Sequence, residues 1–422
     1  MRVLIVNTSE QTGGAAVAAR RLLLALGANG VKARMLVRNK QSQLLTVSAL
    51  PCQRYAHWLF LWERITIWLR LHLRRQHLFD IDTGRCGTDI TRLPEFQEAD
   101  VIHLHWVNQA MLSLDGIRHI LDSGKPVVWT MHDVWPATAI CHLTLDCRRF
   151  EQQCQYCRLL PGGGGRRDLA ERTWRRKQRM LEHRRVSFVA CSEWLAGEAR
   201  RSALLAGQHV TSIPNPIDTQ LFKSGDRQQA RQLLGLPPEG PVILFVSQRA
   251  TNPYKGMSYL VEACQLLAAQ HPQWASQVTV AILGGQAEEL AKFLPMPSRA
   301  LGYIPDEERI VAAYQAADVF VLPSLSENLP NTIMEAMACG APSVAFRVGG
   351  IPEEIDHRQN GYVADYQSST DLAQGIRWAL CEADRNSVRK ACLQKVARCY
   401  SPQSVALKST ELYEDLCSHH HV

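Results

Sequence analysis

The feature that most constrains the fold is a series of short apolar runs, each followed by a segment of helical character. The first run, residues 3–6, leads into Gly13 and Gly14 and then a stretch rich in alanine and leucine. Similar runs occupy residues 100–106, 126–133, 188–192, 242–247, 278–284, 319–322 and 343–346. Aliphatic, β-branched runs that alternate with helices are typical of parallel strands buried on both faces. The sequence therefore predicts an α/β protein with parallel sheets.

The length of the chain predicts two domains. A chain of 422 residues is too long for one ordinary core, and Pro214 and Pro216 make a stiff crossing between the two series of strands. We predict an N-terminal domain over residues 1–212 and a second domain over 213–390. Residues 391–422 are predicted to form a helix that packs back on the first domain and a disordered end.

Composition and charge limit the kinds of binding partner and the location that we expect for the protein. The formal net charge is +7, which favours an anionic partner without identifying it. The sequence contains no run of about 18 uncharged apolar residues that would span a bilayer. The apolar part of the N-terminus is too short for a signal peptide. We therefore expect a cytoplasmic protein.

Two glutamates lie eight positions apart, across the end of a predicted strand, a loop and the start of a helix. The predicted helix begins near Asn331, which would cap it, and ends at Gly340, so that Glu327 precedes the helix and Glu335 lies within it. Free N–H groups at a helix start suit a diphosphate, and carboxylates suit sugar hydroxyl groups. This pattern predicts a sugar-nucleotide site.

The first turn of the chain is open to two interpretations. Gly13 and Gly14 follow the first strand but lack the third spaced glycine of a dinucleotide fingerprint, so a nicotinamide enzyme is poorly supported. Two adjacent glycines allow a backbone to approach a ligand closely. They also serve in any simple tight turn.

The segment 54–75 combines tryptophans, aliphatic residues and arginines with almost no acidic residues. Such a helix can lie on an anionic membrane surface. It can equally pack on the face of its domain with the arginines extended outward. The sequence favours neither interpretation.

Four cysteines fall within seventeen positions: Cys141, Cys147, Cys154 and Cys157. The last two have the spacing with which two thiolates reach one tetrahedral metal ion, which predicts a structural zinc site. The alternative is a group of reduced thiols without a metal. A closed set of four thiolates would leave no coordination position for catalysis, so no metal cofactor is expected in the reaction.

The chain resembles the family-4 retaining glycosyltransferases of GT-B fold over nearly its whole length. The motifs that carry the resemblance are residues 323–342 with Glu327 and Glu335, Gly13 and Gly14, His132 and Asp133, residues 214–218, and Arg249 with Lys255. The cysteine segment is similar to an insertion in some exopolysaccharide glycosyltransferases of the colanic acid type. The resemblance implies two doubly wound, Rossmann-like domains whose parallel sheets face each other across a cleft.

The resemblance also implies roles for individual residues. Arg249 and Lys255 would neutralise the diphosphate of the donor in place of a divalent metal. Glu335 would accept hydrogen bonds from the ribose, and Glu327 would face the transferred sugar. Backbone groups of Asn328, Leu329, Pro330 and Asn331, together with Gly13 and Gly14, would complete the donor site. His132 would position the sugar or stabilise the transition state, and Asp133 would support it or contact the acceptor.

These observations predict a retaining glycosyltransferase of hexosyltransferase type that acts in surface polysaccharide synthesis. Its partners would be a nucleotide-sugar donor, a glycan or lipid-linked acceptor and an anionic membrane surface on the inner face of the cell membrane. A nucleic-acid-binding protein that uses the cysteines and the arginine-rich segment 166–185 is the alternative from another class, although two large α/β domains would then have no role. A nucleotide-sugar epimerase or a glycogen-type phosphorylase on the same fold is the alternative among enzymes.

Overall fold

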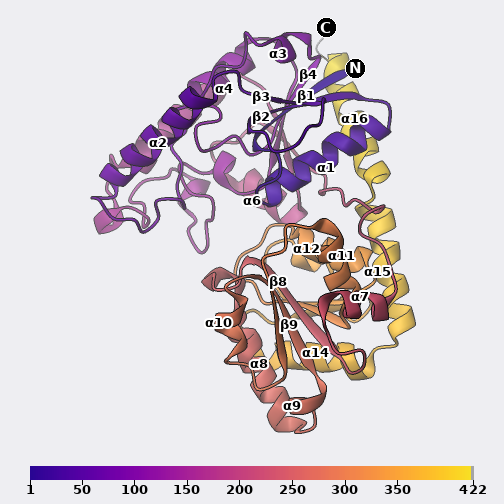
Figure 1. Ribbon diagram of the computed structural model, residues 1–422. Coiled ribbons are helices and arrows are strands. Elements are labelled where there is room, and N and C mark those ends of the chain that lie inside the picture. The colour runs from indigo at the N-terminus through magenta and orange to yellow at the C-terminus, as the bar shows by residue number, and fades with distance from the viewer. Residues whose placement is uncertain (420–422) are drawn as a thin grey trace. The chain divides into compact units, whose positions relative to one another are not determined.

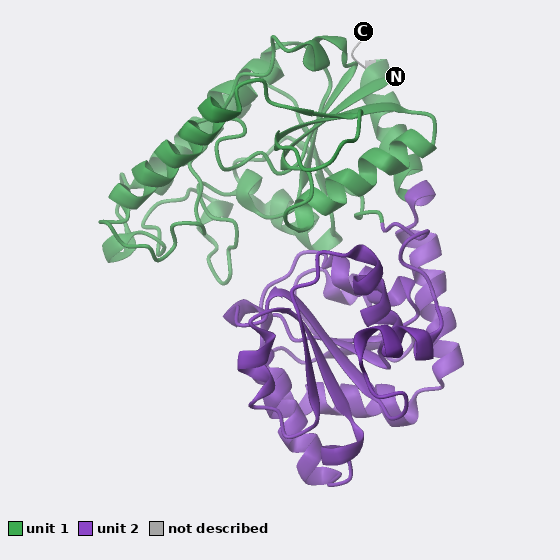
Figure 2. Cartoon of the chain, in the orientation of Figure 1, with its two compact units in different colours: residues 1–216, 405–422 green, residues 217–404 purple. Residues whose placement is uncertain are grey.

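The computed structural model describes residues 1–419 and divides the chain into two compact units (Figure 2). Unit 1 comprises residues 1–216 and the C-terminal segment from Val405, and unit 2 comprises Ile217–Ser404. The predicted boundaries lay after residues 212 and 390, whereas the observed ones lie after residues 216 and 404. The disordered end predicted for the tail concerns residues 420–422, which lie outside the described part of the chain.

Unit 1 contains a seven-stranded parallel sheet with the order β3-β2-β1-β4-β5-β6-β7. The strands are β1 (Arg2–Ser9), β2 (Lys32–Asn39), β3 (Val47–Ala49), β4 (Val101–Leu104), β5 (Val127–Met131), β6 (Ser187–Ala190) and β7 (His209–Ser212). Four of them, β1, β4, β5 and β6, confirm the predicted runs. The remaining three lie outside those runs.

Helices cover both faces of this sheet (Figure 1). Because successive side chains of a strand point to opposite faces, Val3 and Ile5 belong to one buried cluster and Leu4 and Val6 to another. The first cluster contains residues of α1 (Gly14–Ala28) and α16 (Pro402–His419). The second contains residues of α2 (Gln53–Arg70), α4 (Leu114–Asp122), α5 (Leu169–Leu181) and α6 (Glu193–Arg201). Shorter elements of the unit are α3 (Pro94–Glu98) and the 3-10 turns η1 (Trp135–Ala137), η2 (Arg149–Glu151) and η3 (Pro161–Gly163).

Unit 2 contains a six-stranded parallel sheet with the order β10-β9-β8-β11-β12-β13. Its strands are β8 (Val242–Arg249), β9 (Thr279–Gly285), β10 (Ser298–Gly302), β11 (Val319–Leu322), β12 (Ser343–Phe346) and β13 (Gly361–Ala364). The helical elements are α7 (Arg227–Leu234), η4 (Pro253–Lys255), α8 (Met257–Gln270), α9 (Trp274–Gln277), α10 (Ala287–Ala291), α11 (Glu307–Ala316), α12 (Asn331–Ala338), α13 (Ile351–Glu354), α14 (Ser369–Arg377), the π-helical turn η5 (Trp378–Glu382) and α15 (Arg385–Cys399). The strands β8, β9, β11 and β12 confirm the other four predicted runs.

Neither unit offers a membrane-spanning segment in its described part. Across residues 1–419, no helix combines the length and the apolar character that crossing a bilayer requires.

Candidate functional site

Each sheet has one point at which its strand order reverses direction. In unit 1 this point lies between β1 and β4, and in unit 2 it lies between β8 and β11. Ligands of open α/β sheets bind outside the carboxyl ends of the strands at such points. The residues that follow these strands are therefore the candidate site of each unit.

Two cations lie at the end of β8 and just after it in unit 2. Arg249 is the last residue of β8 and is exposed, and Lys255 ends the short turn η4. The next residue, Gly256, has a φ of 68°, and a Cβ atom there would lie 1.8 Å from the carbonyl oxygen of Pro323. Only glycine fits this position, so the turn that carries Lys255 packs directly on the segment after β11.

Lys255 contacts Glu327 directly. Its Nζ atom lies 2.5 Å from Oε1 of Glu327, and the two side chains keep 31% and 12% of their surface exposed. The backbone around Glu327 is fixed by a second close approach, because a Cβ atom on Gly349 would lie 1.7 Å from the Glu327 carbonyl oxygen. The structure thus places the predicted diphosphate cation beside the predicted sugar-facing carboxylate.

Helix α12 begins directly after this loop. Its N-cap is Pro330, which offers no side-chain acceptor, and Asn331 is already the first helical residue. The prediction that Asn331 caps the helix is wrong, because Asn331 is already helical and Pro330, with φ −71° and ψ 114°, has the extended conformation of a cap residue. The first N–H groups of a helix lack partners in a preceding turn; here the carbonyl of Pro330 accepts a hydrogen bond of 3.0 Å from the N–H of Ile333, and the cap residue contributes no side-chain acceptor. This helix start is therefore suited to an anionic group.

Glu335 lies one turn into α12 and is largely buried, with 9% of its surface exposed. Its Oε2 accepts a hydrogen bond of 2.9 Å from the hydroxyl group of Tyr314, which belongs to α11. Tyr314 itself is fully buried. The orientation of the Glu335 carboxylate is therefore fixed by a neighbouring helix.

Besides Glu327 and Glu335, unit 2 has a further carboxyl group of interest, that of Glu354, which was not among the predicted site residues. It ends α13, is completely buried, and has no hydrogen-bond partner for either carboxyl oxygen within the described residues. Burial, followed by the negative charge of Glu327, raises the pKa of Glu354 well above its usual range. A buried carboxyl group in this environment is held in its neutral form. The sequence signal was present, since Glu354 follows the turn after β12 as Glu327 follows β11.

In unit 1, three histidines form a connected group at the ends of β4 and β5. His103 bonds to the hydroxyl groups of Tyr413 and Thr130, at 2.6 and 2.7 Å. Nδ1 of His105 lies 2.9 Å from Nε2 of His132, and the rings of His103 and His105 have centroids 4.3 Å apart. His103 and His105 were not predicted as site residues. They are two positions apart, however, and residues at this interval lie on the same face of a strand.

His132, the predicted sugar-positioning residue, is engaged through both ring nitrogens. Nε2 faces His105, and Nδ1 lies 3.6 Å from the sulfur of Cys191. Cys191 in turn donates to Oδ1 of Asn215 at 3.1 Å. Within the described residues Nε2 of His105 is buried without a hydrogen-bond partner. His132 is thus oriented by a chain of side chains within unit 1.

We expect the stability of unit 1 to fall as the pH falls from about 6.5 to about 4. Burial lowers the pKa of His132 to about 4 and that of His103 to about 3, whereas histidines of the unfolded chain take up protons near pH 6.5. In this window the unfolded state binds more protons, so the free energy of unfolding falls as the pH falls. His132 alone contributes roughly 3 kcal/mol to this decrease.

Urea unfolding across this pH range measures the effect. His132→Gln should flatten the pH dependence, and His57→Gln, at an exposed position of α2, should leave it unchanged. Equal pH dependence in the wild type and His132→Gln would contradict the assignment.

Asp133 has a separate set of partners. Its Oδ2 accepts a hydrogen bond from Nε1 of Trp106 and lies 2.8 Å from Nδ1 of His142, while Oδ1 accepts from the N–H of Trp135. Burial opposes ionisation of Asp133, but the His142 charge and these hydrogen bonds outweigh it and lower the pKa of Asp133. The same pairing raises the pKa of His142 against the effect of burial. Asp133 is therefore a partly buried, ionised carboxylate beside the histidine group.

The glycine turn after β1 precedes helix α1. Gly13 is the N-cap of α1 and has a φ of 93°, which explains the glycine by backbone conformation. A Cβ atom built on it would meet nothing within 4 Å. Both interpretations of this turn therefore remain: the conformation requires glycine, and the open space beside it would admit a ligand.

The four cysteines lie in the segment between β5 and α5. Burial, and then the charges of the neighbouring cysteines, raises the pKa of Cys154 to about 12. No three His, Cys, Asp or Glu side chains among residues 1–419 are arranged to hold a metal ion. A zinc site at these cysteines stays a prediction.

Lys177, which belongs to the arginine-rich segment, is not part of a solvated face. It is 1% exposed, donates a hydrogen bond of 2.9 Å to the carbonyl of Thr138, and lies 3.4 Å from the ring centroid of Trp135. Its role is thus to hold the segment after β5 against helix α5. This residue contributes nothing to a basic surface.

Comparison with protein families gives two matches that follow one another along the chain. Residues 12–221 match Glycosyltransferase Family 4, and residues 240–382 match Glycosyl transferases group 1. A D-inositol 3-phosphate glycosyltransferase from Catenulispora acidiphila is 33% identical over 178 residues, which are 40% of this chain and 41% of that protein. One from Rhodococcus jostii is 28% identical over 244 residues, or 53% of each chain. The chain therefore spans about half the length of the curated relatives it matches.

Solved structures resemble the whole chain. Sucrose-phosphate synthase from Thermosynechococcus elongatus has a TM-score of 0.65 at 19% identity and covers 99% of this chain and 100% of its own. HepE from Anabaena, solved in complex with UDP and glucose, has a TM-score of 0.64 at 18% identity and covers 98% of this chain and 100% of its own. At this identity the likeness shows the fold alone, and it confirms the predicted α/β architecture of GT-B type.

Proposed function

We propose that this chain, which carries a glycosyltransferase family 4 domain followed by a glycosyl transferases group 1 domain, transfers a sugar from a nucleotide-sugar donor with retention of configuration. The observation that carries this proposal is the contact of 2.5 Å between Lys255 and Glu327. It lies at the strand reversal of unit 2, beside the start of α12. A cation, a carboxylate and a helix start within one loop system match the charges and hydroxyl groups of a sugar diphosphate.

The proposed reaction breaks the bond between the anomeric carbon and the diphosphate. Arg249 and Lys255 neutralise the charge that develops on the leaving phosphate oxygen, and Glu327 contacts the sugar. The acceptor oxygen attacks the same face of the sugar, and its proton passes to the leaving phosphate. For His132, held by His105, the proposed role is to position the sugar or stabilise the transition state, and for Asp133 it is to support His132 or contact the acceptor. No metal ion is needed in this scheme.

The donor site is completed by Glu335 and by backbone groups of residues 328–331. Glu335 accepts hydrogen bonds from the ribose hydroxyl groups, in an orientation that Tyr314 fixes. HepE, which shares the fold, was solved in complex with UDP and glucose. This supports testing uridine diphosphate sugars first.

For the acceptor we propose a glycan or a lipid-linked glycan of surface polysaccharide synthesis, as in the colanic acid type of glycosyltransferase. The names of the relatives support a second candidate, D-inositol 3-phosphate, which is a small soluble acceptor. The two acceptors differ in size and solubility, so one assay with both distinguishes them.

A screen of nucleotide sugars tests the proposed function. We expect one donor to raise the melting temperature, because a ligand that binds only the folded state stabilises it by about 2.7 kcal/mol at a hundredfold excess over Kd. We expect the same donor to be slowly hydrolysed, and the hydrolysis to persist in EDTA. Absence of stabilisation by uridine, guanosine and adenosine diphosphate sugars would overturn the proposal. Conversion of the donor to an epimer without an acceptor would identify an epimerase.

A further inference from the structure

Helix α2 of unit 1 is apolar on two opposite faces. On its inner face, Ala56, Leu59 and Ile67 are buried within the unit. Its outer face carries a second apolar set, the α2 stripe: Tyr55, Trp58, Leu61, Trp62, Ile65 and Leu69. Intervals of three and four residues place this set on one side of the helix. Each member keeps between 44% and 55% of its surface exposed.

The aromatic members of the stripe pack against one another on the surface. The ring centroids of Tyr55 and Trp58 lie 6.3 Å apart. Those of Trp58 and Trp62 lie 5.9 Å apart with an interplanar angle of 2°. Three stacked rings thus form a continuous apolar surface in contact with solvent. Such a surface on a folded domain indicates an interaction site.

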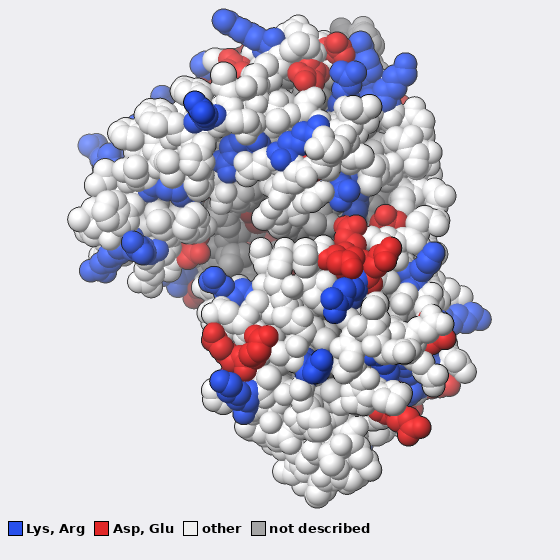
Figure 3. All heavy atoms as spheres, in the orientation of Figure 1, with Lys and Arg blue, Asp and Glu red and all other residues white. Residues whose placement is uncertain are grey.

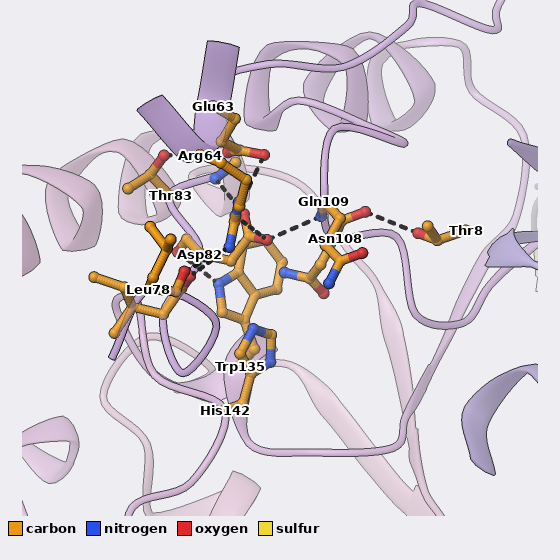
Figure 4. Close-up of polar contacts among 12 residues, drawn as sticks. Thr8, Glu63, Arg64, Leu78, Asp82, Thr83, Asn108, Gln109, Trp135 and His142 are labelled. Carbon is orange, nitrogen blue, oxygen red and sulfur yellow. Dashed lines mark hydrogen bonds and ion pairs between the residues drawn. The ribbon is translucent and has the colours of Figure 1, made fainter. Parts of the chain in front are cut away.

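The inner side of α2 is held by buried polar contacts (Figure 4). Arg64 lies 3.0 Å from Asp82 and donates a hydrogen bond of 2.9 Å to the carbonyl of Leu78. Glu63 accepts a hydrogen bond of 3.2 Å from Thr83. These contacts tie the helix to the segment 78–83, so the stripe is presented by a fixed helix. They also bury Glu63, the acidic residue of α2, completely.

Positive charge flanks the stripe. Arg54 lies at one end, and Arg70, Arg74 and Arg75 lie at the other, all of them exposed. In the space-filling view, the margin of unit 1 formed by α2 shows white surface bordered by blue side chains, with few red ones (Figure 3). A surface of this composition combines an apolar face with attraction to anions.

An open hollow adjoins the C-terminal end of the stripe. Its lining includes Leu69 and three arginines, Arg70, Arg167 and Arg172. The acidic residue of the lining, Asp168, accepts hydrogen bonds from the backbone N–H groups of residues 157, 165 and 171. These backbone hydrogen bonds compensate the negative charge of Asp168. The three arginines of the lining can therefore attract a phosphate group.

We propose that the α2 stripe docks on an anionic phospholipid surface, with its aromatic and aliphatic side chains in the interfacial layer and the flanking arginines on lipid phosphates. Tryptophan and tyrosine favour this layer, arginine side chains extend to it, and anionic lipids add attraction for each basic residue. A second copy of the chain fits less well. A two-fold arrangement of antiparallel α2 helices would set Arg54 of one copy beside Arg70 and Arg74 of the other.

The inference goes beyond the proposed sugar transfer and does not depend on it. Flotation of the full-length protein with vesicles tests it, using phosphatidylcholine alone and phosphatidylcholine with an equal part of phosphatidylglycerol. We expect binding to the mixed vesicles that weakens with salt. The triple variant Arg70→Gln, Arg74→Gln, Arg75→Gln should lower the partition coefficient about a hundredfold. Trp58→Ser with Trp62→Ser should lower it by about tenfold or more.

The matched control is Phe293→Ser with Tyr303→Ser, which removes two exposed aromatic side chains of unit 2 and should leave vesicle binding unchanged. Lipids brominated on the acyl chains provide a second readout. They should quench the fluorescence of the wild type, and Trp58→Phe with Trp62→Phe should abolish most of the quenching.

Binding that is equal for the wild type and the two stripe variants would overturn the proposal. So would a doubled molar mass in light scattering that Trp58→Ser with Trp62→Ser reduces to the monomer, because the stripe would then cover a second copy. Hydrolysis of the donor in vesicle-free solution should be the same in all these variants. A failure of docking is therefore distinguishable from a failure of the proposed sugar transfer.

Discussion

Replacing Lys255 with alanine should lower kcat/KM for sugar transfer by about 10²- to 10³-fold, the range found when one preorganised charge or donor at a developing anion is removed. The Lys255 Nζ atom lies 2.5 Å from Glu327, so the substitution removes the cation proposed to face the departing diphosphate. Lys255→Arg keeps the charge with a different shape and should retain more activity than the alanine variant. Initial rates with the donor from the screen measure the effect.

Two controls separate chemistry from local structure. Lys292→Ala, at an exposed lysine of the same unit, should leave kcat/KM unchanged. The double variant Lys255→Ala with Glu327→Gln removes the stranded negative charge as well. If the loss came only from an unpaired Glu327, the double variant would regain activity, and the role of Lys255 at the diphosphate would be refuted.

The Glu335→Ala variant should bind the donor about 10- to 100-fold more weakly, since hydrogen bonds to a charged group contribute about 1.5 to 3 kcal/mol. The carboxylate is largely buried, so its loss will also reduce the stability of unit 2. For that reason the relevant quantity is Kd from calorimetry at a temperature where the variant is folded.

Tyr314→Phe is the matched control for Glu335. It removes the hydrogen bond of 2.9 Å to the Glu335 carboxylate while keeping both the ring and the charge. We expect its Kd to rise by less than that of Glu335→Ala. A Glu335→Ala variant that binds the donor as tightly as the wild type would remove the ribose assignment.

The sequence predicted the strands that are apolar throughout. The run at 319–322 coincides with β11. A strand that is buried on both faces consists of apolar residues without interruption, so it is easily recognised in the sequence. In contrast, β2 begins and ends with exposed polar residues. Its apolar residues therefore did not stand out as a strand in the sequence. The helix after the Glu327 loop was predicted, but its boundary was displaced by one residue at Pro330.

The prediction of the site was incomplete for residues whose environment is formed by segments distant in the sequence. Lys177 lies in the arginine-rich segment 166–185, yet its ammonium group is buried and donates to carbonyl groups of the segment after β5. The burial of Glu354 depends on the packing around α13, so its position after β12 did not reveal that both carboxyl oxygens lack a hydrogen-bond partner within the described residues. The contact between Lys255 and Glu327, 72 positions apart, was not predicted; the family resemblance implied only that both residues belong to the donor site.

The return of α16 to unit 1 has a consequence for the order in which the chain can fold during synthesis. Val405, Ala406 and Tyr413 belong to the core of unit 1, and the Tyr413 hydroxyl bonds to His103. Unit 2, which ends at Ser404, has all of its residues before these three are made. The unit that begins the chain therefore cannot complete its core until every residue of unit 2 has been synthesised.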